Sequence, residues 1–351
     1  MPTTYAIPDG RTAFATTLWT GTGATQVINN AVNGVSFQPD FVWAKRRNTS
    51  VASHGLVDSV RGTGKTLFSN LTDPEDTGDS NLTAFNSNGF TAGSGGNFNA
   101  SGPTYVGWQW KGGGTAVSNT SGSITSSVSA NTTAGFSVVT YTGTGAAATI
   151  GHGLGAVPSM IILFPRNNTG YAQPVWHTSL GGSTDSDYLV ISNPGARNYA
   201  GALTGLWNST APTSSVFSIG ASNYSNTSTK NYVAYCFAAV PGYSAFGKYT
   251  GNGDPDGPFV YLGFRPRFLL IKNSSVSVDW VIEDTSRDLY NPAGAEIEPN
   301  LNNTETTGNA DLDILSNGFK PRRNSTFANG SGNTIIYAAF AEVPFKYANA
   351  R

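Results

Sequence analysis

Gly64, Lys65 and Thr66, within SVRGTGKTLFSN (59–70), have the types and order that end a phosphate-binding loop. Such a loop surrounds phosphates with backbone N–H groups, and its tight turn needs another glycine five residues before Gly64. That position holds Ser59. The loop must also run into a helix, whereas the next residues, TLFSNLTDPEDTG, read as a short strand and a loop. We therefore predict a surface hairpin or loop here, with Lys65 as a solvated charge.

The three histidines and the single cysteine are the next candidates for chemistry. A zinc site built on histidine needs further ligands at defined spacing, and neither an H-x-x-x-H pattern nor a Cys/His cluster occurs. His54 stands alone, while His152 and His177 belong to neighbouring segments that could meet in space. For those two we expect a solvent-facing loop histidine and a strand-end histidine. Cys236 lies in the strand-like run YVAYCFAAV, which predicts a buried, inert thiol.

Two acidic stretches are suggestive of cation binding. GNGDPDGPF holds Asp254 and Asp256, but the further ligands of a calcium loop are missing, so we predict a proline-bounded turn. GNADLDIL holds Asp311 and Asp313, which we expect in a turn leading into a strand with outward carboxylates. We predict no catalytic, cofactor-binding or metal-binding residues.

Catalysis has little support in the sequence. No G-x-S-x-G elbow accompanies a histidine and an acid. Paired carboxylates of the glycosidase type converge from distant strands, so they stay open. A catalytic site should stand out as a cluster of ionisable residues in one part of the chain, and we expect none. We therefore expect a protein that is not an enzyme.

The composition points to many short strands. Only 12% of the 351 residues are charged, Gly reaches 42, and Trp, Tyr and Phe number 7, 15 and 19. Strand formers between turn formers favour an all-β protein. The net charge of −1 gives no general attraction to nucleic acid or anionic membrane. No apolar run approaches the ~18 residues of a spanning helix, and we expect no membrane insertion.

Five landmarks recur three times in the same order, at intervals of about 105–125 residues. They are a glycine turn (LWTGTGA, TYTGTGA, KYTGNGD), a proline opening a strand (Pro39, Pro158, Pro266), a strand end (Asp58, His177, Asp284), a phenylalanine (Phe90, Phe217, Phe319) and a tyrosine opening a strand (Tyr105, Tyr232, Tyr337). The last strand alternates, and in YVGWQWK we expect the face with Trp108 and Trp110 to be core.

The period fits an all-β domain. We predict three tandem homologous β-sandwich domains of jelly-roll type: repeat 1 (1–113), repeat 2 (114–242) and repeat 3 (243–351). The segment 112–135 begins as a linker, although SITSSVSA could add a strand to repeat 2.

Long stretches of repeats 2 and 3 resemble a family of repeat modules in virion proteins of marine tailed bacteriophages, notably cyanobacterial phages. They are SVSANTTAGFSVVTYTGTGAAATIGHGLGAVPSMIIL, NYVAYCFAAVPGYSAFGKYTGNGDPDGPFVYLGFRP and SNGF with YAAFAEVPF. Repeat 1 is similar through LWTGTG, FQPDFVWAKRR and TYVGWQWKGG. The resemblance implies a tail-fibre-like virion structural protein, made in the host cytoplasm and exposed on the particle. It carries no defined catalytic or binding residues.

These observations lead to three functional hypotheses. The first is a non-enzymatic, tail-fibre-like virion protein that holds to other virion proteins and contacts the host surface, with a glycan as the expected receptor. We expect a homo-oligomer, with a trimer as one arrangement, because repetition gives avidity to a weak module. The alternative is a capsid decoration or head-fibre protein that stabilises or coats the capsid. A polysaccharide depolymerase is a third hypothesis.

Overall fold

The computed structural model describes residues 6–49, 52–181, 187–197, 203 and 205–341. Its regular structure is almost entirely antiparallel β-sheet, so the all-β prediction is confirmed. Short helices occupy little of the described chain: η1 (Gly10–Thr12), α1 (Gly96–Asn99), η2 (Thr178–Leu180) and α2 (Thr326–Asn329). None of the helices in these described ranges is long and apolar enough to cross a membrane.

The strands follow one another closely along the chain. Repeat 1 contains β1 (Phe14–Thr20), β2 (Gln26–Asn29), β3 (Phe41–Arg46), β4 (Gly55–Asp58), β5 (Lys65–Phe68), β6 (Asp76–Thr77), β7 (Leu82–Asn86), β8 (Gly89–Ala92) and β9 (Thr104–Trp110). Repeat 2 contains β10 (Val117–Asn119), β11 (Ser126–Asn131), β12 (Phe136–Thr142), β13 (Ala148–Gly151), β14 (Met160–Pro165), β15 (Pro174–His177), β16 (Leu189–Val190), β17 (Val216–Ile219) and β18 (Asn231–Phe237). Repeat 3 contains β19 (Ser244–Thr250), β20 (Val260–Tyr261), β21 (Pro266–Asn273), β22 (Val281–Asp284), β23 (Leu312–Leu315), β24 (Gly318–Pro321) and β25 (Thr334–Ala341).

One strand order occurs in all three repeats. Each has a large sheet whose central order is β1-β9-β3-β4, β12-β18-β14-β15 or β19-β25-β21-β22. Each also has a small sheet, ordered β2-β8-β7, β13-β17 or β20-β24-β23. Strands β5 and β6 extend the first large sheet, while β10, β11 and β16 extend the second. The stretch SITSSVSA thus does supply a strand to repeat 2, because β11 pairs with β12.

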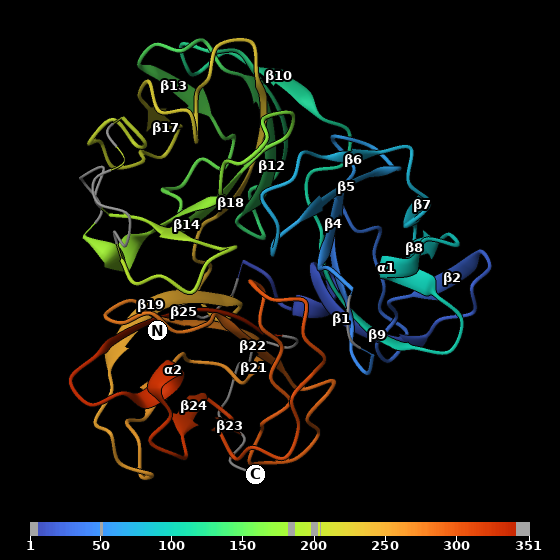
Figure 1. Cartoon of the computed structure of the whole chain (residues 1–351), viewed down its shortest axis with the longest axis vertical. Helices are drawn as coiled ribbons and strands as arrows, with labels where there is room; N and C mark the ends of the chain where they lie inside the picture. Colours follow the sequence, from blue (N-terminus) through green and yellow to red (C-terminus); the bar gives the residue numbers. More distant parts are fainter. Residues whose placement is uncertain (1–5, 50–51, 182–186, 198–202, 204, 342–351) are drawn as a thin grey trace.

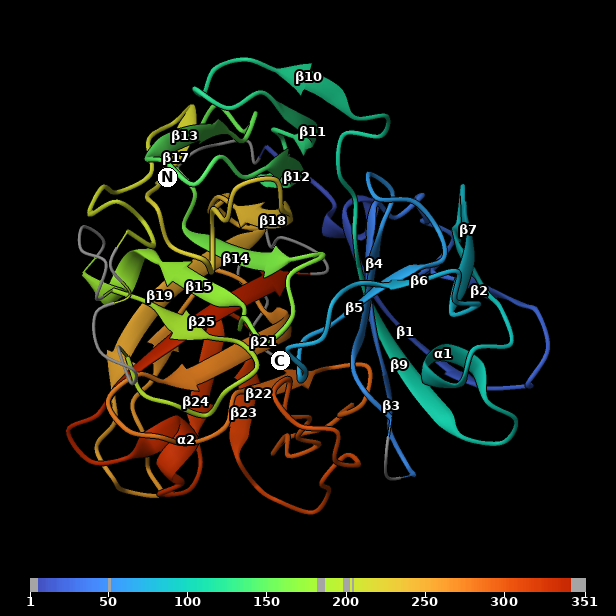
Figure 2. The same cartoon turned by 45° about the horizontal axis from the view of Figure 1, so that its top comes forward.

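Both faces of each large sheet are buried. One face packs on the small sheet of its own repeat, giving three separate apolar clusters. The opposite faces of all three large sheets meet in one shared cluster, the central core. Figure 1 shows the resulting arrangement as three lobes, repeat 1 in blue to cyan, repeat 2 in green to yellow and repeat 3 in orange to red. In the turned view of Figure 2 repeat 1 again lies to one side, while repeats 2 and 3 overlap.

Alternation along the last strand of each repeat produces this double burial. In β9, Trp108 and Trp110 enter the central core as predicted, while Tyr105 on the other face enters the outer cluster of repeat 1. Equivalent residues of β18 and β25 divide in the same way. The ring of Trp110 lies 5.6 Å from that of Phe268 and 6.1 Å from that of Phe237, so repeat 1 contacts both other repeats through this core.

Candidate functional site

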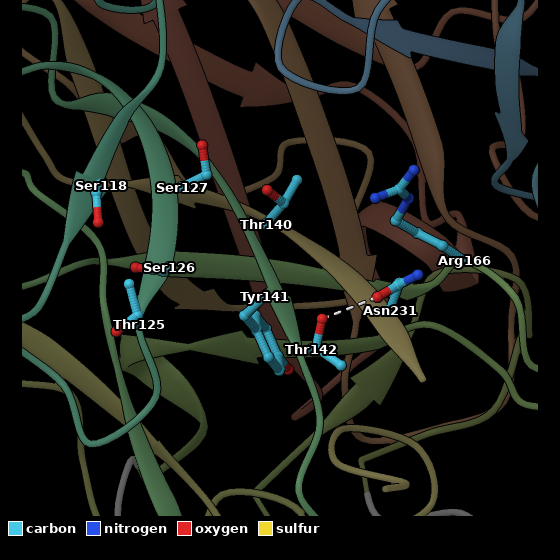
Figure 3. A pocket seen from close by; sticks show the side chains of 9 residues that line it. All are labelled: Ser118, Thr125, Ser126, Ser127, Thr140, Tyr141, Thr142, Arg166 and Asn231. Carbon is cyan, nitrogen blue, oxygen red and sulfur yellow. Dashed lines mark hydrogen bonds between the residues drawn. The ribbon is translucent and has the colours of Figure 1, made fainter. Parts of the chain in front are cut away.

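A groove of about 350 Å³ opens at the end of the large sheet of repeat 2. Strands β10, β11 and β12 form its floor, and the ends of β14 and β18 close one side (Figure 3). Its lining is mostly hydroxyl and amide groups, with one cation: Ser118, Thr125, Ser126, Ser127, Thr140, Tyr141, Thr142, Arg166 and Asn231. In their described residues the other two repeats have no strands corresponding to β10 and β11, so the groove depends on the segment 112–135 that joins repeats 1 and 2.

Three of the groove hydroxyls form a row across the sheet. Ser118 is the register partner of Ser127, and Ser127 is the register partner of Thr140. Such partners lie about 5 Å apart at Cβ. Within the described chain these three hydroxyls have no hydrogen-bond partner, whereas Thr142 already donates to Asn231 Oδ1 (2.9 Å). A free hydroxyl both donates and accepts, so the row suits a neutral ligand rich in hydroxyl groups.

Arg166 connects the groove to the contact between repeats 1 and 2. Its Nε and Nη2 donate to both carboxylate oxygens of Glu75 in repeat 1, each at 2.9 Å. Glu75 also accepts from Arg61 (2.8 Å), which is paired in turn with Asp58 (2.5 Å). Tyr235 of repeat 2 donates to Asp58 (2.9 Å). We call Asp58, Arg61, Glu75 and Arg166 the first charge chain; it runs from the interior of repeat 1 to the edge of the groove.

A second charge chain repeats this geometry between repeats 3 and 1. Asp284 pairs with Arg287 (2.6 Å), Arg287 with Glu305 (3.2 Å), and Glu305 with Arg47 of repeat 1 through two bonds of 2.8 Å. Trp108 of repeat 1 donates to Asp284 (3.0 Å), in the role that Tyr235 plays at the first contact. Burial raises the pKa of Asp284, but Arg287 and Trp108 more than offset this, and the pKa is below its usual value.

The third contact, between repeats 2 and 3, has a histidine in place of the aspartate. His177 ends β15 as Asp58 ends β4. Its Nε2 donates to the carbonyl oxygen of Tyr337 (3.1 Å), and its Nδ1 accepts from the Ser179 amide (3.1 Å). Burial lowers the pKa of His177 to about 4. Each repeat thus uses its strand-end residue to contact the next one, and the three contacts close a ring.

The histidines do not form a common site. His152 is buried rather than solvent-facing, because its Nε2 bonds the Thr213 carbonyl (3.1 Å) and its Nδ1 accepts from the Leu154 amide (3.2 Å). His54 is buried between Trp43 Nε1 (3.0 Å) and the carbonyl of Glu298 (3.0 Å). His177 does end a strand, as predicted. No group of three metal-ligating side chains lies within the ranges that the structure describes.

The GKT stretch lies in strand structure. Residues Lys65–Phe68 form β5, which pairs with β4 and β6. Gly62 and Gly64 have positive φ in the turn before it. A strand follows the glycines where a phosphate loop needs a helix N-terminus, so this segment cannot hold phosphate in that manner. The corresponding stretch of repeat 2, GGSTD, falls mostly on residues 182–186, outside the described chain.

The acidic stretches differ from each other. Asp256 is exposed and pairs with Lys320 (2.5 Å), and the Asp254 carboxylate accepts from the Asp256 amide (2.7 Å), as in a simple turn. Asp313 is half-buried beside Arg322 (3.3 Å). The outward prediction is wrong for Asp311, which is fully buried with other ionisable groups of repeat 3.

The expectation that no repeat carries a cluster of ionisable residues is therefore also wrong. Sequence reasoning missed that cluster and both charge chains, although the spacing Asp-x-x-Arg at Asp58 and Asp284 was a visible signal. Cys236 is buried as predicted, and burial raises the pKa of its thiol.

Comparison with known proteins gives one relationship. A family model described as Domain of unknown function (DUF7483) matches residues 9–344. No curated protein and no solved structure matches the chain. Because the match covers nearly the whole sequence, including all three repeats and the groove, the chain belongs to the DUF7483 family.

Proposed function

We propose that this chain is a non-enzymatic virion structural protein, tail-fibre-like, that binds a neutral saccharide of the host surface in the groove of repeat 2. The row of free hydroxyls across Ser118, Ser127 and Thr140 carries the proposal. Sugars present several hydroxyls that need both donors and acceptors, and serine and threonine supply both. The charge of Arg166 is balanced by Glu75, which favours a neutral ligand over an anionic one.

The scaffold suits a binding role. The groove is open and shallow, as expected for a contact with a polymer rather than for a reaction that must exclude water. We further propose that each repeat is a β-sandwich module, that copies of the chain assemble for avidity, and that the chain attaches to other virion proteins.

Saccharide binding is tested with Thr140→Val and Ser127→Ala, which remove one hydroxyl each. Neutral host-envelope oligosaccharides are titrated calorimetrically against each protein. A hydrogen bond contributes about 1 kcal/mol, so each variant should bind about fivefold more weakly. The matched control is Thr250→Val, an exposed strand-end threonine in repeat 3, which should bind like the unaltered protein. Absence of binding, or equal loss in the control, would show that the groove is not the site.

The location on the particle is tested by immunogold electron microscopy of intact virions. Label on the tail supports the tail-fibre proposal. Label spread over the head supports the alternative, a capsid decoration protein. Label on neither contradicts both. New reducing ends released from host polysaccharide by the purified protein would contradict the non-enzymatic assignment.

A further inference from the structure

Repeat 3 buries three carboxyl groups together, which we call the carboxyl cluster: Glu283, Glu296 and Asp311. Their residues are 1%, 7% and 0% exposed. Arg323 pairs with Asp311 and with Glu296 (3.0 Å), and Asn309 donates to Glu296 (2.6 Å). The other carboxyl oxygen of Asp311, Oδ2, is buried and has no hydrogen-bond partner among the described residues. A buried carboxyl oxygen without a partner favours the protonated form of the group.

Glu283 is the residue that sets repeat 3 apart. It lies one position before the strand-end residue, where repeats 1 and 2 have the apolar residues Val57 and Trp176. Within the part of the chain that the structure describes, neither carboxylate oxygen of Glu283 has a hydrogen-bond partner. An ionised carboxylate without partners in the interior costs many kcal/mol, so the group takes up a proton instead. Repeat 3 therefore buries a protonated carboxyl group at a position where the other two repeats bury an apolar side chain.

The cluster lies at the base of a loop, residues 296–306, which we call the strap. The loop is closed by two hydrogen bonds of 3.0 Å between the backbones of Glu296 and Thr306. Beside this closure, Ile297 exchanges backbone bonds with Ile282, the neighbour of Glu283. The carboxyl cluster and the backbone hydrogen bonds that close the strap thus lie at the same place in repeat 3.

The strap is also the main polar connection of repeat 3 to repeat 1. Backbone carbonyl groups of the strap accept hydrogen bonds from three side chains of repeat 1. In addition, the Glu305 carboxylate accepts from the Arg47 guanidinium, and the Glu305 amide donates to the Arg47 carbonyl (2.7 Å). These three hydrogen bonds run from His54 to the carbonyl of Glu298 (3.0 Å), from Ser69 to that of Pro299 (2.6 Å) and from Lys45 to that of Asn302 (3.3 Å).

Electrostatics make these groups sensitive to pH in the neutral to alkaline range. Burial raises the pKa of Glu283, with Asp311, Asp288 and Glu296 adding to the rise and Arg287 opposing it. Burial, helped by the neighbouring Glu296 and opposed by Arg323, raises the pKa of Asp311 to about 8. Tyr249, from β19, also faces Glu283.

The strap itself holds further groups that titrate in this range. Burial, with Glu296 and Asp279, raises the pKa of Glu298 to about 7 against the opposing charge of Lys45. Burial lowers the pKa of Lys45 to about 8, with Arg46 adding to the fall.

We propose that the strap is a proton-controlled latch: protons on the carboxyl cluster keep the base of the strap closed, and their loss loosens the contact between repeats 3 and 1. The sign follows from the raised carboxyl pKa values. Their contribution to stability is complete below about pH 4 and is lost as pH rises through about 8 for Asp311. Lys45 acts in the opposite direction, since its contribution is lost as pH falls through about 8.

The test is hydrogen exchange of the full-length protein at pH 6 to 9, corrected for the intrinsic pH dependence of exchange. Release of one proton on opening changes the opening constant tenfold per pH unit. The Asp311 proton has this effect only below its pKa of about 8, so through this group the strap amides of Glu305 and Thr306 should lose protection about tenfold between pH 6 and 7. Asp311→Asn should abolish this loss. Glu283→Gln keeps the shape of the side chain and should shift the pH at which protection is lost. It is the variant to use if Asp311→Asn does not fold.

The matched control is Asp313→Asn, two residues along the same segment but half-exposed and paired with Arg322. It should respond to pH like the unaltered protein. Equal pH responses in all variants would overturn the latch. Simultaneous loss of protection in β13 and β17 of repeat 2 would also overturn it, because the opening would then be global.

Discussion

Replacing Arg61 with methionine tests whether the charge chains hold the repeats together. The guanidinium is fully buried and makes five contacts: with Asp58, Glu75, the Tyr235 hydroxyl, and the carbonyls of Lys65 and Leu56. Methionine fills much of the same volume without a charge. The substitution therefore removes the electrostatic role and leaves most of the packing.

The expected loss is large because Asp58 stays behind. Removing one partner of a buried ion pair costs about 3–5 kcal/mol, since the remaining charge is uncompensated. Asp58 keeps the amides of Val60 and Arg61 and the Tyr235 hydroxyl, which places the estimate near the lower end, about 3 kcal/mol. Adding Asp58→Asn removes that charge, so the double variant should recover part of the loss.

Urea unfolding followed by tryptophan fluorescence measures the free energy of unfolding. The control is Arg322→Met, whose arginine is 42% exposed and paired at the surface, and it should cost at most about 1 kcal/mol. Arg287→Met at the equivalent contact should cost about as much as Arg61→Met. An Arg61→Met protein that unfolds like the Arg322→Met control would refute the reasoning, as would a double variant less stable than the single one.

Two further predictions concern turns and the third contact. Gly89→Ala should cost about 1–3 kcal/mol in the free energy of unfolding, because φ is +135° and a Cβ would lie 2.0 Å from the Ile28 carbonyl oxygen. Gly102→Ala, also at positive φ but in open space, should cost less, and equal costs would contradict the steric argument. His177 contributes stability that is complete above its ordinary pKa of 6.5 and is lost as pH falls through about 4. His177→Asn should remove up to about 3 kcal/mol of the pH dependence of unfolding in that window, measured by urea titration, and an unchanged dependence would contradict it.

The sequence predicted the local elements well because their signals are local. Asp58, His177 and Asp284, found by counting from the prolines, each end a strand. Phe90 and Phe319 lie in the corresponding strands β8 and β24 and are fully buried. Alternation also identified the core face of β9. These features depend on residues within one strand or one hairpin, where period and turn chemistry are sufficient.

The contacts between repeats could not be predicted in the same way. Arg166 and Glu75 are 91 positions apart, and Arg47 and Glu305 are 258 apart, so no local period connects them. Charged residues are also usually exposed, which is why Asp311 was predicted to face outward. The groove could not be predicted from the sequence for a related reason: many of its hydroxyls come from a segment whose composition also fits a linker.

Because the central core is shared, repeat 1 cannot complete its packing until repeat 3 has been synthesised. Phe14 and Trp110 pack on Phe268 and Phe340, which are made long after them. At typical translation rates of about 5–20 residues per second, the aromatic face of repeat 1 waits on the order of 10–50 s for its last partner. During that time an apolar surface stays uncovered on the ribosome-bound chain. The yield of soluble protein should therefore depend on chaperones and on translation speed more than the final stability would suggest.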